Sequence, residues 1–273
     1  MVVLIGVLLG SGSGFDLNEA RDHLFQSWAS FCDSGSLQSW TCYWCNATKV
    51  QNIALLSNTT TDVVGFVGVD TTRNEIVVSF RGSKTIENWI NDFDFIFTQP
   101  YTDQSTIKVH SGFWDSYTSI SSQLVPALKA RISGCPHCKR IAFVGHSLGA
   151  AVTTLAFMDI VYRHKITQPT PVIYNFGQPR VGNAAWVSWV RSFGNATRLV
   201  QAADIVPHLP PVDFDYRHMA TEVWILSDQS NAYKVCDASG EDPTCSDSLD
   251  IYSRADHLLY LGYNVRNGQP NGC

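Results

Sequence analysis

Apolar and polar positions along the chain follow two periods, one typical of helices and one typical of strands. In residues 16–31 the apolar positions recur every three to four residues, which predicts an amphipathic helix. Residues 32–51 are polar and contain cysteines, and we predict a loop there. Residues 63–69 and 75–80 are rich in β-branched residues and flank a turn-prone polar segment, so they predict an antiparallel hairpin.

The rest of the chain alternates strand-like runs with helical ones. Residues 107–109 predict a brief strand, and the helical pattern that follows extends to residue 132, although Pro126 should perturb it. After residue 139 the alternation is typical of parallel β-α-β units, so we predict an α/β fold with the hairpin as an antiparallel flank of the same sheet. The predicted helices there are 147–164 and 184–193, and the predicted strands are 141–144, 171–176, 197–203 and 221–226.

The apolar run 141–144 leads into Gly145-His146-Ser147-Leu148-Gly149, a G-x-S-x-G motif followed by an alanine-rich helical segment. A strand, a tight turn and a helix in this order can hold a serine in a strained conformation with its hydroxyl exposed, because the two glycines allow close approach. The pattern predicts that Ser147 is a catalytic nucleophile. The alternative is an ordinary turn of small residues.

A serine nucleophile needs a general base, which in α/β-hydrolases follows the serine and the acid along the chain. His257 is our candidate, because its loop near the C-terminus can fold back over the edge of the sheet. Three other histidines follow Ser147. His164 ends the helix of the serine, His208 lies too close to the best acid candidate, and His218 precedes a predicted strand and is more typical of a structural hydrogen bond.

For the acid we predict Asp204, which follows a predicted strand and therefore lies where active-site loops gather. The alternative is that Asp204 only stabilises a turn before Pro207. Asp213 and Asp215 are then the other candidates for the acid. The negatively charged oxygen of the tetrahedral intermediate, the oxyanion, needs hydrogen-bond donors. We expect two: the backbone N–H of Leu148, and Ser83, which follows the strand ending at residue 80.

A specificity element is expected in residues 85–93. Ile86, Trp89, Ile90 and Phe93 recur at helical spacing, so a short helix there would have one apolar face. Such a face could bind a lipid surface. The alternative is a surface helix that packs on the core.

Composition and cysteine content restrict the class of protein. With 273 residues and 45% hydrophobic residues the chain can form one large domain, which we assign to residues 15–273. A net charge of -5 and the absence of a Lys/Arg run argue against nucleic acid as a partner. No segment is apolar for long enough to span a membrane. Residues 1–14 resemble the apolar region and cleavage zone of a secretory signal. They lack the basic region with which such a signal begins, so we expect a truncated start.

Eight cysteines indicate an oxidising compartment, as do glycosylation sequons at Asn46, Asn58 and Asn195. Two C-x-x-C pairs could hold zinc, but they lie far apart in different surroundings, so we expect four disulfides and no metal. The predicted location is extracellular.

These segments together resemble the fungal-type class 3 lipase family, which includes filamentous-fungal triacylglycerol lipases and feruloyl esterases. The resemblance covers residues 63–263, in the family's order. It rests on Phe80-Arg81-Gly82-Ser83, Ile86-Glu87-Asn88-Trp89-Ile90, His110-Ser111-Gly112-Phe113, Gly145-His146-Ser147-Leu148-Gly149, Gly177-Gln178-Pro179-Arg180-Val181-Gly182-Asn183, Asp204-Ile205-Val206-Pro207 and Asp256-His257-Leu258.

The resemblance implies an α/β-hydrolase fold with helices on both faces of the sheet and a short helical lid over the site, in residues 85–93. It implies the triad Ser147, Asp204 and His257, with Ser83 and Leu148 as oxyanion donors. His110 and His146 precede or flank the nucleophile, and we expect them to support the site rather than to act as the base.

The resemblance also pairs Cys32 with Cys273 and Cys236 with Cys245, which leaves Cys42–Cys45 and Cys135–Cys138 as local pairs. The implied activity is hydrolysis of acylglycerol esters at a lipid surface, without cofactor, metal or obligate protein partner. The alternatives are a phospholipase A1 or galactolipase, a feruloyl-type esterase, and a non-catalytic binding relative.

Overall fold

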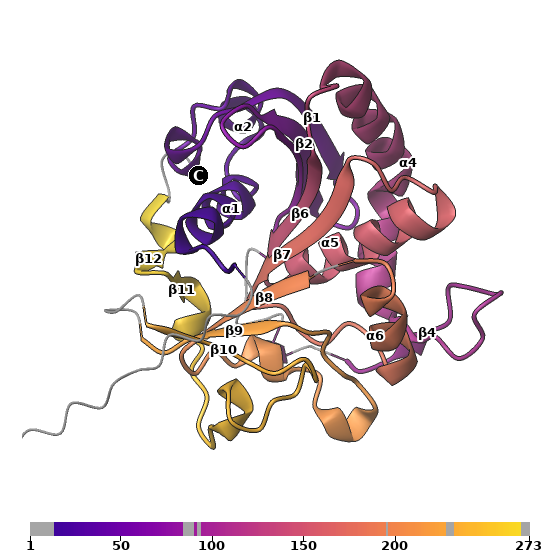
Figure 1. Cartoon of the computed structure of the whole chain (residues 1–273), viewed down its shortest axis with the longest axis vertical. Helices are drawn as coiled ribbons and strands as arrows, with labels where there is room; N and C mark the ends of the chain where they lie inside the picture. Colours follow the sequence, from indigo (N-terminus) through magenta and orange to yellow (C-terminus); the bar gives the residue numbers. More distant parts are fainter. Residues whose placement is uncertain (1–13, 84–89, 92–93, 195, 228–231, 269–273) are drawn as a thin grey trace, which may run out of the picture.

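The computed structural model describes residues 14–83, 90–91, 94–194, 196–227 and 232–268. Residues 1–13 of the predicted signal segment lie outside them. One central sheet has eight strands in the order β1-β2-β3-β6-β7-β8-β9-β10 (Figure 1). These strands are β1 (Val50–Asn58), β2 (Val63–Asp70), β3 (Glu75–Phe80), β6 (Arg140–His146), β7 (Thr170–Phe176), β8 (Ala196–Gln201), β9 (Glu222–Ile225) and β10 (Tyr233–Val235).

The sheet is mostly parallel, as predicted. Strands β3, β6, β7, β8 and β9 run in the same direction. Strands β1 and β2 pair antiparallel at one edge, and β10 pairs antiparallel with β9 at the other. The carboxyl ends of the parallel strands therefore meet at one edge of the sheet, where functional loops can gather.

Strands β2 and β3 form the predicted hairpin. The sequence pattern did not predict the edge strand β1, because a register shift between Gln51 and Ala54 interrupts the alternation of its apolar positions. The predicted loop 32–51 also contains two short helices, α2 (Ser34–Ser39) and the 3-10 helix η1 (Trp44–Ala47). Elements this short show too few positions for a helical period to be visible.

Helices cover both faces of the sheet (Figure 1). Helix α1 (Leu17–Ala29) lies on one face, beside the short C-terminal strands β11 (Leu259–Tyr260) and β12 (Tyr263–Asn264). Helices α4 (Ser111–Gly134), α5 (Leu148–Met158) and α6 (Ala184–Arg191) lie on the other. Each face has its own hydrophobic core, and β6 contributes alternate residues to the two, which explains its continuous apolar run.

Helix α4 continues through Pro126, although we expected a perturbation there. Pro126 and Ser122 lie on the exposed side of the helix, so water can hydrate the carbonyl that loses its backbone donor. Helix α5 is shorter than predicted, because residues Asp159–Arg163 form a π-helical turn. No helix in the described part of the chain has the length and apolar character needed to cross a membrane.

One buried polar cluster joins α1 to the sheet at the amino ends of the parallel strands. His23 is fully buried, and its Nδ1 hydrogen-bonds Gln26 Oε1 at 2.9 Å. Its two ring nitrogens lie 3.6 Å from Glu19 Oε1 and 3.7 Å from Glu75 Oε1. Arg140 Nη2 approaches Glu75 Oε2 at 2.7 Å. Burial alone would lower the pKa of His23, but Glu19, Glu75 and Gln26 raise it above its usual value.

We expect this cluster to make stability depend on pH. Since the pKa of His23 is raised on folding, its imidazolium stabilises the fold fully below the unfolded value of about 6.5, and the contribution disappears as pH rises through the raised folded value. The Tm advantage of the wild type over His23→Gln should therefore be larger at about pH 6 than at about pH 9. His137→Gln, in an exposed turn, should show no such trend. A pH-independent difference would contradict the prediction.

Candidate active site

Ser147 lies at the apex of the turn between β6 and α5. Its backbone has φ 60° and ψ -132°, a strained conformation for a residue with a Cβ. Its N–H donates to the carbonyl of Phe176 at 3.0 Å, which ties the turn to the end of β7. A Cβ on Gly149 would lie 2.0 Å from the carbonyl oxygen of Phe80, so only glycine allows α5 to approach β3 this closely.

A buried polar network behind the turn fixes the first turns of α5 against β7. Asn175, at the end of β7, donates to the carbonyl of Ala150 at 2.9 Å and to Gln178 Oε1 at 2.8 Å. Thr153 and Thr154 on α5 donate to Asn175 and Gln178 in return. Our sequence reasoning missed this network. Its one signal is that polar Asn175 interrupts the apolar run just before β7 ends at Phe176.

His257 and Asp204 form a buried pair next to this turn. His257 is on the 3-10 turn η6 (Asp256–Leu258), and its Nδ1 lies 2.9 Å from each carboxylate oxygen of Asp204. Both residues are 0% exposed. The carboxylate of Asp256 accepts the N–H of Ala203 at 2.9 Å, so the loops that follow β8 and precede β11 are joined beside the pair.

Asp204 remains ionised despite its complete burial. Burial would raise its pKa, but the charge of His257 and hydrogen bonds from His257, Tyr260 and the N–H of Val206 hold the pKa below its usual value. Tyr260 Oη donates to Oδ2 at 2.6 Å and the N–H of Val206 donates to Oδ1 at 2.9 Å. Sequence reasoning missed Tyr260, although it is only three residues from His257.

His146 is uncharged and packs against His257. Its Nε2–H donates to the carbonyl of His257 at 2.8 Å, and the two rings stack with centroids 4.6 Å apart. Burial and the proximity of His257 lower the pKa of His146 to about 3, so its imidazole is neutral. The ring also meets Trp28 of α1 edge-on, which connects the site to the helix on this face.

Ser147 Oγ and His257 Nε2 are both buried, and neither has a hydrogen-bond partner among the described residues. Buried polar atoms are nearly always paired, so unpaired ones mark candidate functional positions. In apo enzymes catalytic hydrogen bonds are often long and form only with substrate. An imidazole that a carboxylate holds at Nδ1 has Nε2 available to take a proton from a hydroxyl.

The loop after β3 lies against Ser147. A Cβ on Gly82 would lie 3.1 Å from the Cβ of Ser147, so Ser83 follows the point of closest approach. Arg81 fixes this loop through its N–H to the carbonyl of Val64, at 2.8 Å, and an ion pair with Asp62. Leu148 is the first residue of α5, and its N–H therefore lies at the positive end of the helix dipole.

Part of the predicted lid can be located. Ile86, Trp89 and Phe93 lie outside the described residues. Ile90 is half-buried and helical, and the adjacent Asn91 accepts a hydrogen bond from Arg254 at 3.0 Å, three residues before His257.

Three further histidines have structural partners. His110 donates from Nε2 to the carbonyl of Asp94 at 2.7 Å, and so fixes the segment that follows the predicted lid. His218 donates to the carbonyl of Pro207 at 2.5 Å, the kind of bond that its position predicted. His208 contacts Asp247 and stacks on Tyr252.

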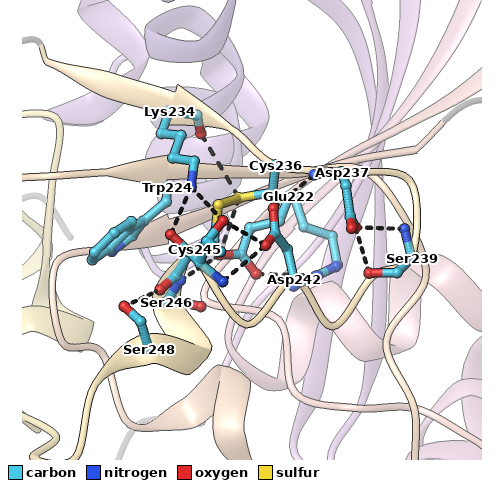
Figure 2. Close-up of a disulfide and its surroundings, with 12 residues drawn as sticks. Glu222, Trp224, Lys234, Cys236, Asp237, Ser239, Asp242, Cys245, Ser246 and Ser248 are labelled. Atoms are coloured by element: carbon cyan, nitrogen blue, oxygen red, sulfur yellow. Dashed lines mark hydrogen bonds and ion pairs between the residues drawn. A yellow bond between two sulfur atoms is a disulfide. The ribbon is translucent and has the colours of Figure 1, made fainter.

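Three of the predicted disulfides are present: Cys42–Cys45, Cys135–Cys138 and Cys236–Cys245. The fourth predicted pair, Cys32–Cys273, includes a residue outside the described ones. Figure 2 shows Cys236–Cys245 with Glu222, whose Oε1 accepts the N–H of Ser246 at 3.2 Å. Glu241, in the loop that this disulfide closes, pairs with Arg180 at 2.7 Å and so joins the loop to the segment after β7.

The three sequons differ in accessibility. Asn46 is exposed on η1, whereas Asn58 is half-buried and its amide donates to the carbonyl of Ser119 at 3.1 Å. Asn195 lies outside the described residues. Asn46 is therefore the sequon with the more accessible amide of the two that can be compared.

Gly177 allows the Asp204–His257 pair to form, and this gives a prediction. It has φ +55°, and a Cβ there would lie 2.8 Å from both Asp204 Oδ2 and His257 Cε1. We expect Gly177→Ala to displace the imidazole and to lower kcat/KM about 100-fold on a soluble ester. Gly134→Ala is the control, because no atom lies within 4 Å of its added Cβ. Activity of Gly177→Ala within twofold of the control would contradict the prediction.

Comparison with known proteins identifies the family. The class 3 lipase family model matches residues 77–214. A lipase from Rhizomucor miehei is 34% identical over 257 residues, which are 92% of this chain and 70% of that protein. A secreted mono- and diacylglycerol lipase A from Penicillium cyclopium is 37% identical over 170 residues, which are 62% of this chain but only 54% of that protein.

The solved structures agree. A triacylglycerol lipase described as having a serine protease triad as its catalytic centre superposes with a TM-score of 0.84 at 34% identity, over 93% of this chain and 97% of that one. The family model, the Rhizomucor miehei lipase and the solved structure all match the stretch that carries the serine turn and the Asp204 loop. The chain therefore belongs to the class 3 lipase family of carboxylic ester hydrolases.

Proposed function

We propose that the protein is a secreted lipase that hydrolyses acylglycerol esters through a serine acyl-enzyme. The observation that carries the proposal is the buried Asp204–His257 pair beside Ser147 at the strained turn. Neither His257 Nε2 nor Ser147 Oγ has a hydrogen-bond partner in the part of the chain that the structure describes. The relatives support it, since one is described as a triacylglycerol lipase with a serine triad and another as a secreted mono- and diacylglycerol lipase.

In the first half of the reaction Ser147 Oγ attacks the ester carbonyl while His257 Nε2 takes its proton. Asp204 holds the imidazole by Nδ1 and stabilises the imidazolium that forms. The N–H of Leu148, together with Ser83, donates to the oxyanion of the tetrahedral intermediate. The intermediate collapses, His257 gives its proton to the departing alcohol, and the acyl group remains on Ser147.

In the second half a water molecule attacks the acyl-enzyme. His257 takes a proton from the water, the same donors stabilise the second tetrahedral intermediate, and the fatty acid leaves as Ser147 regains its proton. Because His146 is neutral, the imidazolium that forms at His257 is not repelled by a positive charge on the ring stacked against it.

Substrate choice depends on residues 85–93. The apolar side chains of Ile86, Trp89, Ile90 and Phe93 would bind a lipid surface, because burying apolar area contributes about 25 cal/mol per Å2. A feruloyl-type esterase would be expected to have a more polar segment here, so these residues favour lipid substrates.

Removal of the nucleophile tests the chemistry. We expect Ser147→Ala to lower kcat about 10⁶-fold on any ester substrate, because the acyl-enzyme cannot form. Ser133→Ala, an exposed serine on α4, should retain full activity. A Ser147→Ala protein with more than a small fraction of wild-type turnover would exclude the mechanism, and an inactive wild type would favour a binding protein.

The response to a lipid surface tests the substrate class. We expect the rate on emulsified acylglycerol to rise sharply once the substrate exceeds its solubility limit, and Trp89→Ala to reduce that rate far more than hydrolysis of a soluble short-chain ester. Initial rates on triacylglycerol, diacylglycerol, phosphatidylcholine and the soluble ester would be compared. Activity confined to the soluble ester would indicate an esterase, and a preference for phosphatidylcholine would indicate a phospholipase.

A further inference from the structure

Tyr260 is a buried tyrosine three residues after His257. It ends the two-residue strand β11, and its hydroxyl donates to Asp204 Oδ2 at 2.6 Å. The side chain is fully buried, and its ring meets the rings of His146 and Phe176 edge-on, with centroids 5.6 Å and 5.9 Å away. Tyr260 therefore contacts the acid of the site from within the protein interior.

A tight two-residue hairpin turn follows Tyr260. Tyr260 pairs with Tyr263 across a two-residue connection, Leu261-Gly262, in which both residues have positive φ, 52° and 82°. Two positive φ values are the mark of a tight hairpin turn that matches strand twist. Leucine is unusual in such a position, and its N–H is held by Gln201 Oε1 at 3.2 Å.

Asp204 Oδ2 is shared between two donors. Both Tyr260 Oη and His257 Nδ1 approach it, at 2.6 Å and 2.9 Å. Each donor to a carboxylate withdraws negative charge from it, so a strong bond from Tyr260 weakens the attraction that Asp204 exerts on the imidazolium. Burial and the Asp204 carboxylate raise the pKa of Tyr260 well above its usual value, so the hydroxyl is a permanent donor.

We propose that Tyr260 is a positioning residue that sets the basicity of His257 through Asp204. The inference rests on the proposed function, in which neutral His257 is the general base. With Tyr260 in place, Asp204 holds the imidazole but does not over-stabilise its charged form. The base then stays neutral, and able to take the proton of Ser147, down to a lower pH.

Other charged or titratable groups near the pair act in the same way in wild type and variant. His146 is neutral, and Asp256 is engaged by the N–H of Ala203. Glu222 begins β9, where it lies opposite Arg198 of β8 and forms an ion pair with it. A change confined to the Tyr260 hydroxyl therefore isolates its effect on Asp204.

The test is the pH profile of kcat/KM on a soluble short-chain ester, where lipid binding does not contribute. Tyr260→Phe keeps the ring and removes the hydroxyl. We expect the acid limb, which reports loss of the neutral base, to move to higher pH by about 0.5 to 1 unit. The rate on the alkaline plateau should fall less than about tenfold.

Tyr263→Phe is the matched control, since Tyr263 is the cross-strand partner of Tyr260 and contacts Phe25 instead of Asp204. Its acid limb should coincide with that of the wild type. Placing 3-fluorotyrosine at position 260 makes the hydroxyl a stronger donor and replaces only one ring hydrogen by the slightly larger fluorine, so the limb should move to lower pH. This second variant tests the proposal even where Tyr260→Phe folds poorly.

Shifts of opposite sign in the two variants support the proposal. If neither acid limb moves and only the rate or the Tm falls, the proposal is overturned and Tyr260 has a packing role only. The outcome is separate from that of the proposed function: if Ser147→Ala retained activity, the mechanism would fail, whereas unmoved limbs with an inactive Ser147→Ala would refute only the role of Tyr260.

Discussion

The site depends on one interaction, the contact of a fully buried carboxylate with a fully buried imidazole. Asp204 can be ionised in this dry environment only because His257, Tyr260 and the N–H of Val206 together offset the loss of water. A carboxylate surrounded by fewer donors would take up a proton and release the ring. The donors come from two segments that are distant in the chain, the loop after β8 and residues 257–260, so tertiary structure maintains the charge.

The topology of the sheet brings these loops together. Ser83, Ser147, Gly177 and Asp204 each follow a different strand, and those strands, β3, β6, β7 and β8, are neighbours and parallel. Their carboxyl ends therefore meet on one edge, within reach of the turn that carries His257. Close approach is possible because glycine stands where a side chain would collide, as at positions 149 and 177.

The two histidines in stacking contact show how environment separates the roles of identical side chains. His146 is enclosed by α1 and the sheet, has lost its charge, and uses Nε2 to hold the backbone of His257. His257 faces an ionised partner, and its Nε2 has no hydrogen-bond partner among the residues that the structure describes. One ring is a support and the other is available for proton transfer, and only their neighbours differ. At the opposite end of the strands, His23 is held between two carboxylates and has a raised pKa instead.

The sequence by itself determined the features that depend on local order: the parallel strands and their helices, the glycine-flanked Ser147, and the family. It also indicated Asp204 and His257 as candidates, because chain order and strand ends restrict the choice. Only the tertiary structure decided which donors surround Asp204, that Tyr260 is among them, and that β1 extends the flank. The physical reason is that periodicity and motifs record contacts between near neighbours in the chain. Burial and hydrogen bonds between distant loops arise only when the sheet brings those loops to one edge.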